Sequence, residues 1–462
     1  MSNIDTLTIT FHGNDLAVIG NCEFLQNRFT HTTDNKVTYF YPKDFFSILD
    51  AISNNKTQYT VDFPFDFTIA DNLVFNKNYQ LYDFQQEAVQ SWLDNNRKGI
   101  ILLPTGAGKT IISLEIICIL RTSTLIVVPT LVLLEQWKNS IVTFLGLEES
   151  NIGEFGGGKQ EIKDITVITY DSAHLYVKRL RNLFGFIILD EAHHLAGNSY
   201  EIIADGYIAP YRLALTATLE RDELAFENLG SKGFNKIIYS LKPNQLQKLE
   251  VLTNYTIETI KVKLQDQNEY ERLIGILQNY LRRFQYNPEI PAFKQLIFRI
   301  NKDRNAQEAL QAYQTAKTLS FSADTKLVEL ERLLRQYRDD KVLIFSDMVS
   351  FCERISKVFF IPCITHRTVK EERKWILNYY KRVKNAKLVV SKIFDEGVDI
   401  PDAKIGIIVV GSGKSRQFIQ RLGRILRHYP GKDKAILYEI ISEDTLEERL
   451  SNKRKKDTFL PP

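Results

Sequence analysis

The sequence predicts an α/β protein with two parallel-sheet lobes, a small α+β domain at its N-terminus and a helical insertion. The prediction rests on short apolar runs that alternate with helical patterns in two separate sets, which is typical of doubly wound parallel sheets. The composition agrees, because 44% of the 462 residues are hydrophobic and 25% are charged. These are ordinary values for a globular protein, and the length suffices for about two to four domains.

Residues 1–80 differ from the rest of the chain in their turn chemistry. Short segments rich in Thr, Val, Phe and Tyr are separated by turn residues such as Gly13-Asn14 and Asn54-Asn55, a pattern typical of short strands. One helix is predicted near residues 42–54. We therefore expect a small, mainly β-rich domain over residues 1–80.

The two lobes are predicted over residues 81–240 and 241–462. Each expected strand is an apolar run bounded by turn or cap residues. In the first lobe these runs are Gly99–Leu103, Thr124–Val128, Thr166–Ile168, Phe186–Leu189 and Arg212–Leu215; in the second they are Val342–Phe345, Lys387–Val390, Ile405–Val410 and Ala435–Ile440. Residues 266–320 have helical spacing without strand alternation, so a helical insertion is predicted there.

Composition excludes several classes of protein. No apolar run approaches the ~18 residues that a membrane span needs, and the first residues lack the pattern of a secretion signal. The four cysteines form no C-x-x-C pair, which argues against a zinc ribbon or a redox motif and favours small buried thiols in a reducing compartment. The net charge of +4 fits either a polyanionic partner or a solvated mixed-charge surface.

A glycine loop follows the first apolar run of the first lobe. Leu103 leads into Pro104-Thr105-Gly106-Ala107-Gly108-Lys109-Thr110, and an apolar helix comes next. A loop between strand and helix is the context of a phosphate-binding loop, in which backbone amides and a helix N-terminus face the phosphates. Lys109 would reach the β- and γ-phosphates, and the Thr110 hydroxyl would bind Mg²⁺. The predicted ATP-binding residues here are Thr105, Gly106, Ala107, Gly108, Lys109 and Thr110.

A carboxylate pair completes this site. Asp190 and Glu191 directly follow the apolar run Phe186–Leu189. Asp190 can hold Mg²⁺, and Glu191 can orient and deprotonate the attacking water. Gly411–Ser415 also follows an apolar run, but no later run ends in an Asp-Glu pair, so the first loop is favoured.

A basic helix is predicted near the far end of the chain. Gln420, Arg424 and Arg427 are spaced by four and three residues, which places them on one helical face. Such a face can present guanidinium groups to a γ-phosphate. We therefore group these three residues with Lys109 and Glu191 as catalytic candidates; the alternative is a basic surface helix.

Taken in order, these motifs resemble those of superfamily 2 helicases over Leu81 to about Arg449. The matching segments are Phe84-Gln85, Thr105–Thr110, Val128–Thr130 with Leu134–Trp137, Thr169-Tyr170, Asp190–His193, Leu215–Thr218, Ile344–Ser346, Ser391–Pro401 and Gln420–Arg427. Within the superfamily the chain is most similar to the XPB (xeroderma pigmentosum group B) family, in a short archaeal-like form. Arg221-Asp222-Glu223 stands where that family has Arg-Glu-Asp, and Tyr82 replaces an arginine of the family.

The resemblance implies two RecA-like lobes that bind ATP and Mg²⁺, and a thumb-like role for the helical insertion. It also implies that residues 1–80 take the place of the family's damage-recognition domain. Further ATP contacts are implied at Phe84, Gln85, Gly397 and Asp399. Coupling roles between ATP and the nucleic acid are implied at His193, Thr216 and Thr218.

Nucleic-acid contacts are expected mainly to phosphates. The candidates are Thr130, Gln136, Thr169, Arg221, Ser346, Ser391 and Lys392. Arg282 and Arg283 join them because basic residues are interleaved with aromatic ones in the insertion. For the hydroxyl residues the alternative is helix capping, and for the insertion it is a small aromatic core with solvated charges.

The implied activity is a 3′-5′ DNA helicase or translocase that acts in nucleotide excision repair or in transcription. The expected partners are DNA, as a fork, bubble or single strand, and a structure-specific nuclease or another repair or transcription protein. We expect a monomer without membrane contact, in the cytoplasm beside the nucleoid, or in the nucleus of a eukaryote. Two alternatives stay open, an RNA-activated ATPase and a non-hydrolysing DNA clamp that recruits a partner.

Overall fold

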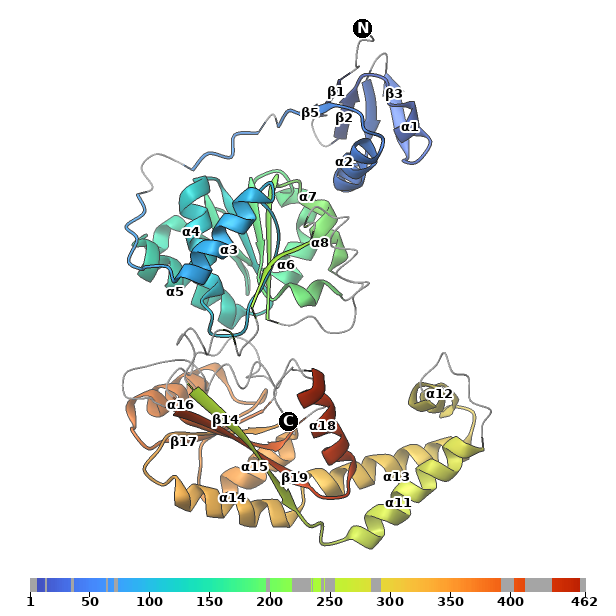
Figure 1. The fold of residues 1–462 in the computed structure, drawn as a ribbon, viewed down its shortest axis with the longest axis vertical. Helices are drawn as coiled ribbons and strands as arrows, with labels where there is room; N and C mark the ends of the chain where they lie inside the picture. Colours follow the sequence, from blue (N-terminus) through green and yellow to red (C-terminus); the bar gives the residue numbers. More distant parts are fainter. Residues whose placement is uncertain are drawn as a thin grey trace. The chain divides into compact units, whose positions relative to one another are not determined.

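The computed structural model describes residues 6–12, 15–34, 37–63, 65–69, 74–196, 200–217, 234, 236–241, 245, 254–283, 292–391, 403–411 and 434–457. The chain divides near residue 245 into two compact units. Each unit is built around its own parallel sheet (Figure 1), and each is described by itself below.

The first unit begins with a small α+β domain. Its sheet has the order β3-β4-β2-β1-β5, and two helices accompany it. The strands are β1 (Leu7–His12), β2 (Asp15–Ile19), β3 (His31–Asp34), β4 (Val37–Phe40) and β5 (Tyr59–Val61); the helices are α1 (Glu23–Gln26) and α2 (Phe45–Asn54), with the short 3-10 turn η1 (Pro42–Asp44) before α2. Apolar side chains of β1, β2 and α2 form one core. The helix expected near residues 42–54 is therefore present.

A cation–π contact joins this domain to the first lobe. The Phe46 ring of α2 lies 3.7 Å from the guanidinium carbon of Arg212, which is fully buried. Arg212 donates hydrogen bonds to the carbonyl oxygens of Ala204, Tyr207 and Ala209. Burial lowers the pKa of Arg212 to about 9. Three backbone acceptors and an aromatic face together compensate for removing this charge from water.

The segment that links the two parts runs along the first lobe. The amide of Ile69 donates to the Arg121 carbonyl, and the amide of Asn76 donates to the Leu145 carbonyl. Tyr79 and Lys77 both bond the Glu115 carboxylate. Residues 65–69 and 74–80 are thus bonded to the lobe at several points, which anchors the chain before α3 begins.

The first lobe has an eight-stranded sheet of order β13-β6-β12-β11-β7-β10-β8-β9. All its pairs are parallel except the β8–β9 hairpin. The strands are β6 (Lys98–Leu102), β7 (Thr124–Val128), β8 (Ile152–Gly156), β9 (Lys159–Gln160), β10 (Ile165–Thr169), β11 (Phe186–Leu189), β12 (Tyr211–Thr216) and β13 (Ile237–Ser240). The helices are α3 (Asp83–Asp94), α4 (Lys109–Leu120), α5 (Leu131–Leu145), α6 (Tyr170–Leu175), α7 (Val177–Leu180) and α8 (Glu201–Gly206), with 3-10 turns η2 (Glu149–Asn151) and η3 (Ala192–Ala196).

The second unit has a six-stranded sheet of order β14-β19-β18-β15-β17-β16, with every pair parallel. The strands are β14 (Asn254–Val262), β15 (Val342–Ser346), β16 (Cys363–Ile364), β17 (Lys387–Val390), β18 (Ile405–Val410) and β19 (Lys434–Ser442). The helices outside the insertion are α14 (Asp324–Gln336), α15 (Val349–Phe359), α16 (Lys370–Arg382) and α18 (Leu446–Asp457). The predicted α/β class with two parallel-sheet lobes is confirmed.

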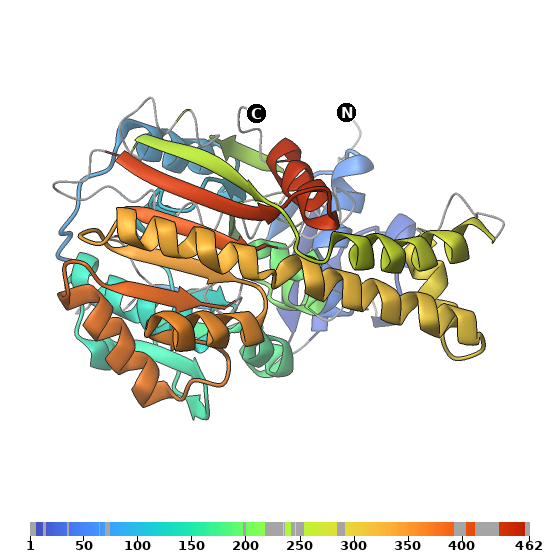
Figure 2. The same ribbon diagram turned by 90° about the horizontal axis from the view of Figure 1, so that it is seen from below.

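The helical insertion lies between β14 and β15 of this second sheet. It consists of α11 (Gln267–Arg282), α12 (Ala292–Arg299) and α13 (Arg304–Phe321). Figures 1 and 2 show α11 and α13 side by side, extending past the edge of the sheet. Buried Ala312 and Ala316 of α13 pack with Tyr270 and Leu273 of α11, because small side chains allow the two helices to approach closely.

A buried ion pair ties the C-terminal helix to the second sheet. The Lys326 ammonium lies 2.7 and 2.6 Å from the two carboxylate oxygens of Glu447, and both side chains are essentially unexposed. Lys326 also donates to the Val409 carbonyl, and Glu447 accepts from the Ser442 amide. These additional bonds satisfy both charges, which a pair removed from water requires.

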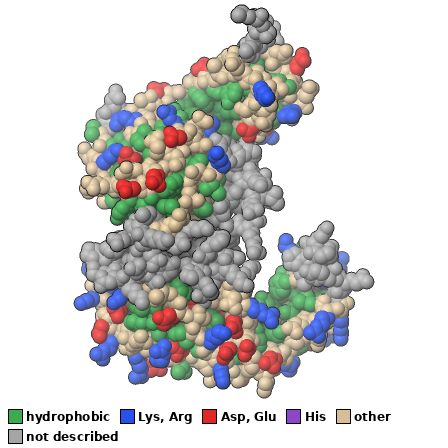
Figure 3. Space-filling model, viewed as in Figure 1, with side chains coloured by type: hydrophobic (Ala, Val, Ile, Leu, Met, Phe, Trp, Pro, Cys, Tyr) green, Lys and Arg blue, Asp and Glu red, His purple; other side chains and the backbone are tan. Residues whose placement is uncertain are grey.

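The surface is of mixed charge, and no described helix is long and apolar enough to cross a bilayer. On the face seen in Figure 3, basic and acidic side chains are interspersed over the described parts of both units. This face therefore lends no support to a polyanion site built on net charge alone.

Replacing Lys326 by Ala is expected to destabilise the second unit by about 3–5 kcal/mol, because Glu447 would remain buried without its cation. The double variant Lys326→Met/Glu447→Leu should recover most of that loss. Urea unfolding followed by circular dichroism measures both. As a control, Arg335→Ala breaks an exposed pair with Glu331 and should cost only about 0.5 kcal/mol or less. Equal losses in the two single variants would contradict this account.

Replacing Lys98 by Met is expected to stabilise the first unit at pH 7 and to have little effect near pH 10.5. Burial, together with the nearby Arg212 charge, lowers the pKa of Lys98 to about 8 from 10.5. The charged form is therefore penalised in the folded state below pH 8, and the penalty disappears as the pH rises to 10.5. It is at most about 3 kcal/mol. Melting temperatures of both proteins across this pH range test the sign, and a gain independent of pH would contradict it.

Candidate functional site

The glycine loop connects β6 to α4 and requires glycine at two positions. Gly106 and Gly108 have φ angles of 90° and 77°, in the left-handed region that favours glycine. A Cβ atom at Gly108 would lie 2.4 Å from the Gln85 side-chain nitrogen. Glycine is needed there for both the backbone conformation and the close approach of Gln85.

Polar groups in this loop suit a phosphate. The Lys109 ammonium donates to the Leu103 carbonyl at 3.1 Å, so the side chain folds back over the loop. The Thr105 hydroxyl is buried and has no hydrogen-bond partner within the described part of the chain. Thr110 lies in the first turn of α4, where backbone amides face outward from the helix.

Gln85 ties the start of α3 to the glycine loop. Its side-chain oxygen accepts from the Tyr82 amide and its nitrogen donates to the Ala107 carbonyl, both at 3.0 Å. The exposed Tyr82 ring stacks on Phe84, which is buried, with centroids 5.9 Å apart and planes 16° from parallel. An exposed aromatic face thus stands where the family has an arginine. That Phe84 and Gln85 recognise the adenine base of ATP stays a prediction.

Asp190 follows β11 and is held from three sides. The Trp137 indole donates to one carboxylate oxygen at 2.8 Å, and the Glu191 amide donates to the other at 2.9 Å. The Tyr170 hydroxyl donates to the Asp190 carbonyl. Burial raises the pKa of Asp190, while the Trp137 bond and the Lys109 charge oppose the rise. β6 leads into the glycine loop and β11 leads into Asp190; both pair in parallel with β12, so the loop and this carboxylate follow the same edge of the sheet.

Glu191 stands in a backbone conformation that is uncommon outside glycine, with φ of 50°. His193 Nδ1 lies 3.4 Å from the Glu191 carboxylate and 3.4 Å from the hydroxyl of Thr216. Thr216 ends β12 and is fully buried. The imidazole therefore stands between the carboxylate that we expect to activate water and the strand that leads into the Leu215–Thr218 motif.

The residues present fit Mg²⁺. Thr110 and Asp190 offer a hydroxyl and a carboxylate, the oxygen ligands that this ion prefers. Among the described residues, no group of three or more His, Cys, Asp or Glu side chains could hold a metal ion.

Two candidate nucleic-acid contacts lie at the carboxyl ends of neighbouring β-strands. Thr130 follows β7 and caps α5 by accepting from the Leu133 amide. Thr169 ends β10 and caps α6 by accepting from the Ser172 amide. β7 and β10 pair in parallel. Both hydroxyls thus have the capping role that we considered as the alternative, while Gln136 is partly buried on α5; contact with nucleic acid stays a prediction for all three.

In the second unit, Ser346 ends β15 and Ser391 directly follows β17, the strand with which β15 pairs. Both residues are buried. The Ser346 hydroxyl bonds the backbone of Met348, whereas the Ser391 hydroxyl has no partner among the residues that the structure describes.

Arg282 ends α11, Arg283 is the C-cap of that helix, and both are exposed. Of the aromatic residues expected near them, Phe298 is 73% exposed, and Phe293 packs against Tyr313. The insertion thus combines an aromatic contact with exposed rings and cations, and neither of the two expectations for it is excluded.

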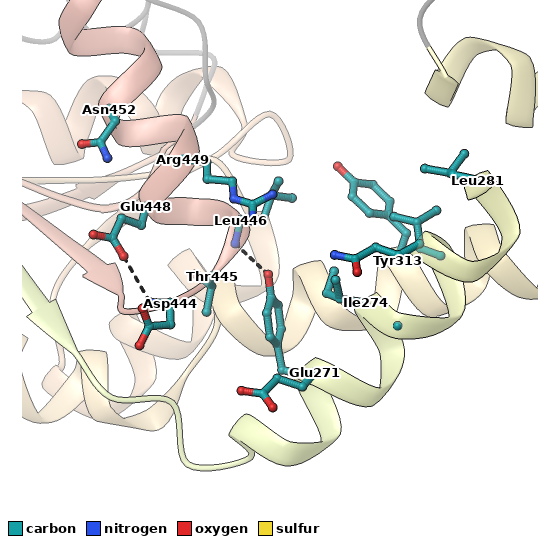
Figure 4. A pocket seen from close by; sticks show the side chains of 14 residues that line it. Glu271, Ile274, Leu281, Tyr313, Asp444, Thr445, Leu446, Glu448, Arg449 and Asn452 are labelled. Carbon is teal, nitrogen blue, oxygen red and sulfur yellow. Dashed lines mark hydrogen bonds between the residues drawn. The ribbon is translucent and has the colours of Figure 1, made fainter. Parts of the chain in front are cut away.

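A pocket of about 680 Å³ lies at the base of the insertion, between α11, α13 and α18 (Figure 4). The Leu446 amide donates to the Tyr270 hydroxyl there at 2.7 Å. Apolar side chains such as Ile274 and Leu281 line one side, and Arg449 and Glu448 lie on the other. None of its lining residues belongs to the glycine loop or to the Asp190-Glu191 pair, so this pocket is distinct from the candidate nucleotide site.

Several predicted residues lie outside the described part of the chain. They are Thr218, Arg221, Lys392, Gly397, Asp399, Gln420, Arg424 and Arg427. The structure therefore brings together the glycine loop, Asp190, Glu191, His193 and Thr216, and leaves the arginine face untested. Sequence reasoning missed Trp137 and Tyr170 as partners of Asp190, although both stand inside motifs that it had identified.

Comparison with known proteins finds two family models that match separate parts of the chain. Residues 78–221 match the family described as Type III restriction enzyme, res subunit. Residues 305–460 match the ERCC3/RAD25/XPB C-terminal helicase family. Among solved structures, the helicase domain of Hef from Pyrococcus furiosus superposes with a TM-score of 0.55 at 18% identity, covering 81% of this chain and 98% of that domain. At this identity the likeness shows the fold alone.

Curated relatives agree with the family assignment. The chain is 40% identical over 395 residues to the DNA 3′-5′ translocase XPB2 of Sulfurisphaera tokodaii, covering 84% of this chain and 88% of that protein. It is 27% identical to the DNA 3′-5′ helicase XPB of Mycobacterium tuberculosis, covering 82% of this chain but 64% of the relative. It is 26% identical to the XPB subunit of general transcription and DNA repair factor IIH of Dictyostelium discoideum, covering 83% of this chain and 47% of that protein. The resemblance inferred from the motifs is thereby confirmed, and the chain belongs to the XPB family of DNA helicases and translocases.

Proposed function

We propose that this protein is an ATP-driven DNA translocase of 3′-5′ polarity that opens or tracks duplex DNA in nucleotide excision repair or in transcription-related processing. The observation that carries the proposal is that the glycine loop with Lys109 and the turn with Asp190, Glu191 and His193 follow parallel strands at one edge of the same sheet. The Sulfurisphaera relative is named as a DNA 3′-5′ translocase, which supports the direction of movement.

The chemistry follows from the side chains of the first unit. Lys109 exchanges its bond to the Leu103 carbonyl for phosphate oxygens of ATP. Thr110 and Asp190 hold Mg²⁺, which when bound neutralises charge on the phosphates. Glu191 accepts the proton of the attacking water, and His193 holds that carboxylate in place. Thr216 lies on the other side of the imidazole and transmits a change at the nucleotide site to β12.

The second unit would complete the site. Gln420, Arg424 and Arg427 are proposed to contact the γ-phosphate, with Gly397 and Asp399 binding the nucleotide. An arginine supplied in this way contributes about 10³–10⁵ in rate in related phosphoryl-transfer enzymes. Because Gln420, Arg424 and Arg427 belong to the second predicted lobe and the glycine loop to the first, hydrolysis would alternate two arrangements of the lobes, which is the physical basis of translocation.

DNA is proposed to be held mainly through its phosphates. Short hydroxyls, amides and lysine at the sheet edges suit contacts independent of sequence. The proposed residues are Thr130, Gln136, Thr169, Arg221, Ser346, Ser391 and Lys392, with Thr218 beside Thr216 in the coupling motif. Affinity should therefore fall steeply with salt.

The domain assignment is part of this proposal. We assign residues 1–80 to a damage-recognition-like domain, 81–240 to the first helicase lobe and 241–462 to the second. A structure-specific nuclease or a repair or transcription protein is the proposed partner, and the nucleoid region, or the nucleus of a eukaryote, is the proposed location. The Dictyostelium relative is named as a subunit of a transcription and repair factor, which favours such an assembly.

Replacing Glu191 by Gln is expected to lower DNA-stimulated ATP hydrolysis by about 10²–10⁴-fold, because the general base is lost. Lys109→Ala should abolish hydrolysis together with nucleotide binding. Phosphate release is measured with single-stranded DNA, duplex DNA and RNA as activators, and nucleotide binding by calorimetry. Glu161→Gln removes a carboxylate from an exposed position and serves as the control.

The activators separate the competing functions. Stimulation by DNA and not by RNA supports the proposal, whereas stimulation by RNA alone favours an RNA-activated ATPase. A wild-type protein that binds DNA but hydrolyses no ATP is the non-hydrolysing clamp. Unimpaired rates in both Glu191→Gln and Lys109→Ala would remove the assigned site altogether.

Replacing both Arg282 and Arg283 by Ala is expected to weaken DNA-stimulated hydrolysis while basal hydrolysis stays unchanged. If each arginine contacts one phosphate, the slope of log affinity against log salt should fall by about 2. The matched control is Arg332→Ala/Arg335→Ala on α14, two arginines that pair with glutamates on an exposed surface. A thumb role is contradicted if both double variants keep the wild-type stimulation and salt slope.

A further inference from the structure

Two helices begin at residues that are predicted to contact nucleic acid. Each of them places an aromatic side chain against Asp190. α5 is capped by Thr130 and carries Trp137 two turns later. α6 is capped by Thr169 and begins with Tyr170. Trp137 bonds the carboxylate of Asp190, and Tyr170 bonds its carbonyl. The residue proposed to hold Mg²⁺ is thus in direct contact with both helices.

The Trp137 bond is placed to control the carboxylate. Trp137 is 2% exposed and Asp190 is 7% exposed, so no bulk water competes for this bond. A hydrogen bond to a charged group in such surroundings is stronger than a neutral one. An indole offers one donor and no acceptor, so it fixes one oxygen while the Glu191 amide fixes the other. The plane of the carboxylate is thereby set.

Packing alone does not account for this contact. Trp92 is another buried tryptophan of the same unit, and its indole donates to the backbone carbonyl of Arg212 at 2.9 Å. A backbone carbonyl satisfies a buried indole without involving a functional group. Trp137 instead donates its only N–H to the side chain of Asp190. The two residues are therefore equal in burial and bonding but differ in their partners.

We propose that Trp137 is a positioning residue that couples helix α5 to the metal-binding carboxylate. The inference rests on the proposed function and names one route by which DNA acts on the nucleotide site. When a strand binds at the N-terminus of α5, near Thr130 and Gln136, the helix is held or displaced. Trp137 transmits that change to one oxygen of Asp190 and thereby to the affinity for Mg²⁺ with its nucleotide.

The test compares two substitutions that separate donor from volume. Trp137→Phe keeps most of the ring volume and removes the donor. Trp137→His loses the benzene ring but keeps a ring N–H at the equivalent position. The matched controls are Trp92→Phe and Trp92→His, which make the same changes where the acceptor is the Arg212 carbonyl. All measurements are made at pH 8, below the melting temperature of each variant, with folding checked by circular dichroism.

The main readout is binding and not turnover. Calorimetry gives the affinity for ADP with and without Mg²⁺, and the ratio of the two is the enhancement due to the metal. Trp137→Phe should reduce this enhancement by about 10–100-fold, the usual effect of removing a group that orients a metal ligand. Trp137→His should retain more of it than Trp137→Phe. Both Trp92 variants should keep the wild-type enhancement.

The second readout is the ratio of DNA-stimulated to basal ATP hydrolysis. It should fall in Trp137→Phe and stay at the wild-type level in the Trp92 variants. The proposal is overturned if Trp137→Phe matches Trp92→Phe in both readouts, or if Trp137→His is the more damaging of the two Trp137 variants. Should Trp137→Phe fail to fold, Trp137→His decides, because loss of the enhancement in a folded variant that keeps the donor contradicts the proposal.

Failure of this inference is distinct from failure of the proposed function. If the wild-type protein hydrolyses ATP on DNA and Trp137→Phe behaves like its control, only the role of Trp137 is lost. If the wild-type protein hydrolyses no ATP with any nucleic acid, the function itself is wrong.

Discussion

The candidate site depends on keeping one carboxylate buried, oriented and able to bind a cation. Burial alone favours protonation of Asp190, and a protonated acid is a poor ligand for Mg²⁺. The Trp137 indole, the Glu191 amide and the charge of Lys109 oppose this effect. These three groups come from α5, the turn after β11 and the start of α4. The chemistry of the site therefore depends on how these elements pack at the sheet edge.

Other buried charges in the molecule are stabilised by different means. Arg212 is surrounded by backbone carbonyls and the Phe46 ring, and Lys326 is paired with Glu447. Each of these charges joins separate elements: Arg212 joins the N-terminal domain to the first lobe, and Lys326 joins α14 to the C-terminal helix. Breaking such a contact leaves an uncompensated charge, so these charges specify how the elements fit together.

Local patterns allowed most of the architecture to be predicted. The apolar runs placed the central strands within one or two residues, because a strand covered on both faces reads as a continuous apolar segment. β14 was missed because its sequence, Asn-Tyr-Thr-Ile-Glu-Thr-Ile-Lys-Val, is not a continuous apolar run and keeps no strict alternation, as suits a strand at the edge of the sheet. β8 and β13 were missed for related reasons, since glycines interrupt β8 and the side chains of β13 are largely uncovered. The helical insertion was found because it lacks strand alternation.

By itself, the sequence determined the order of the motifs, the two-lobed α/β class and the identity of the glycine loop and carboxylate pair, because these depend on local spacing and on residue type. Only the tertiary structure decided that Trp137 reaches Asp190, 53 residues further along the chain, and that His193 stands between Glu191 and Thr216. These contacts cross from one strand–helix connection to another. Such pairings arise from the packing of the sheet edge, and no local periodicity encodes them.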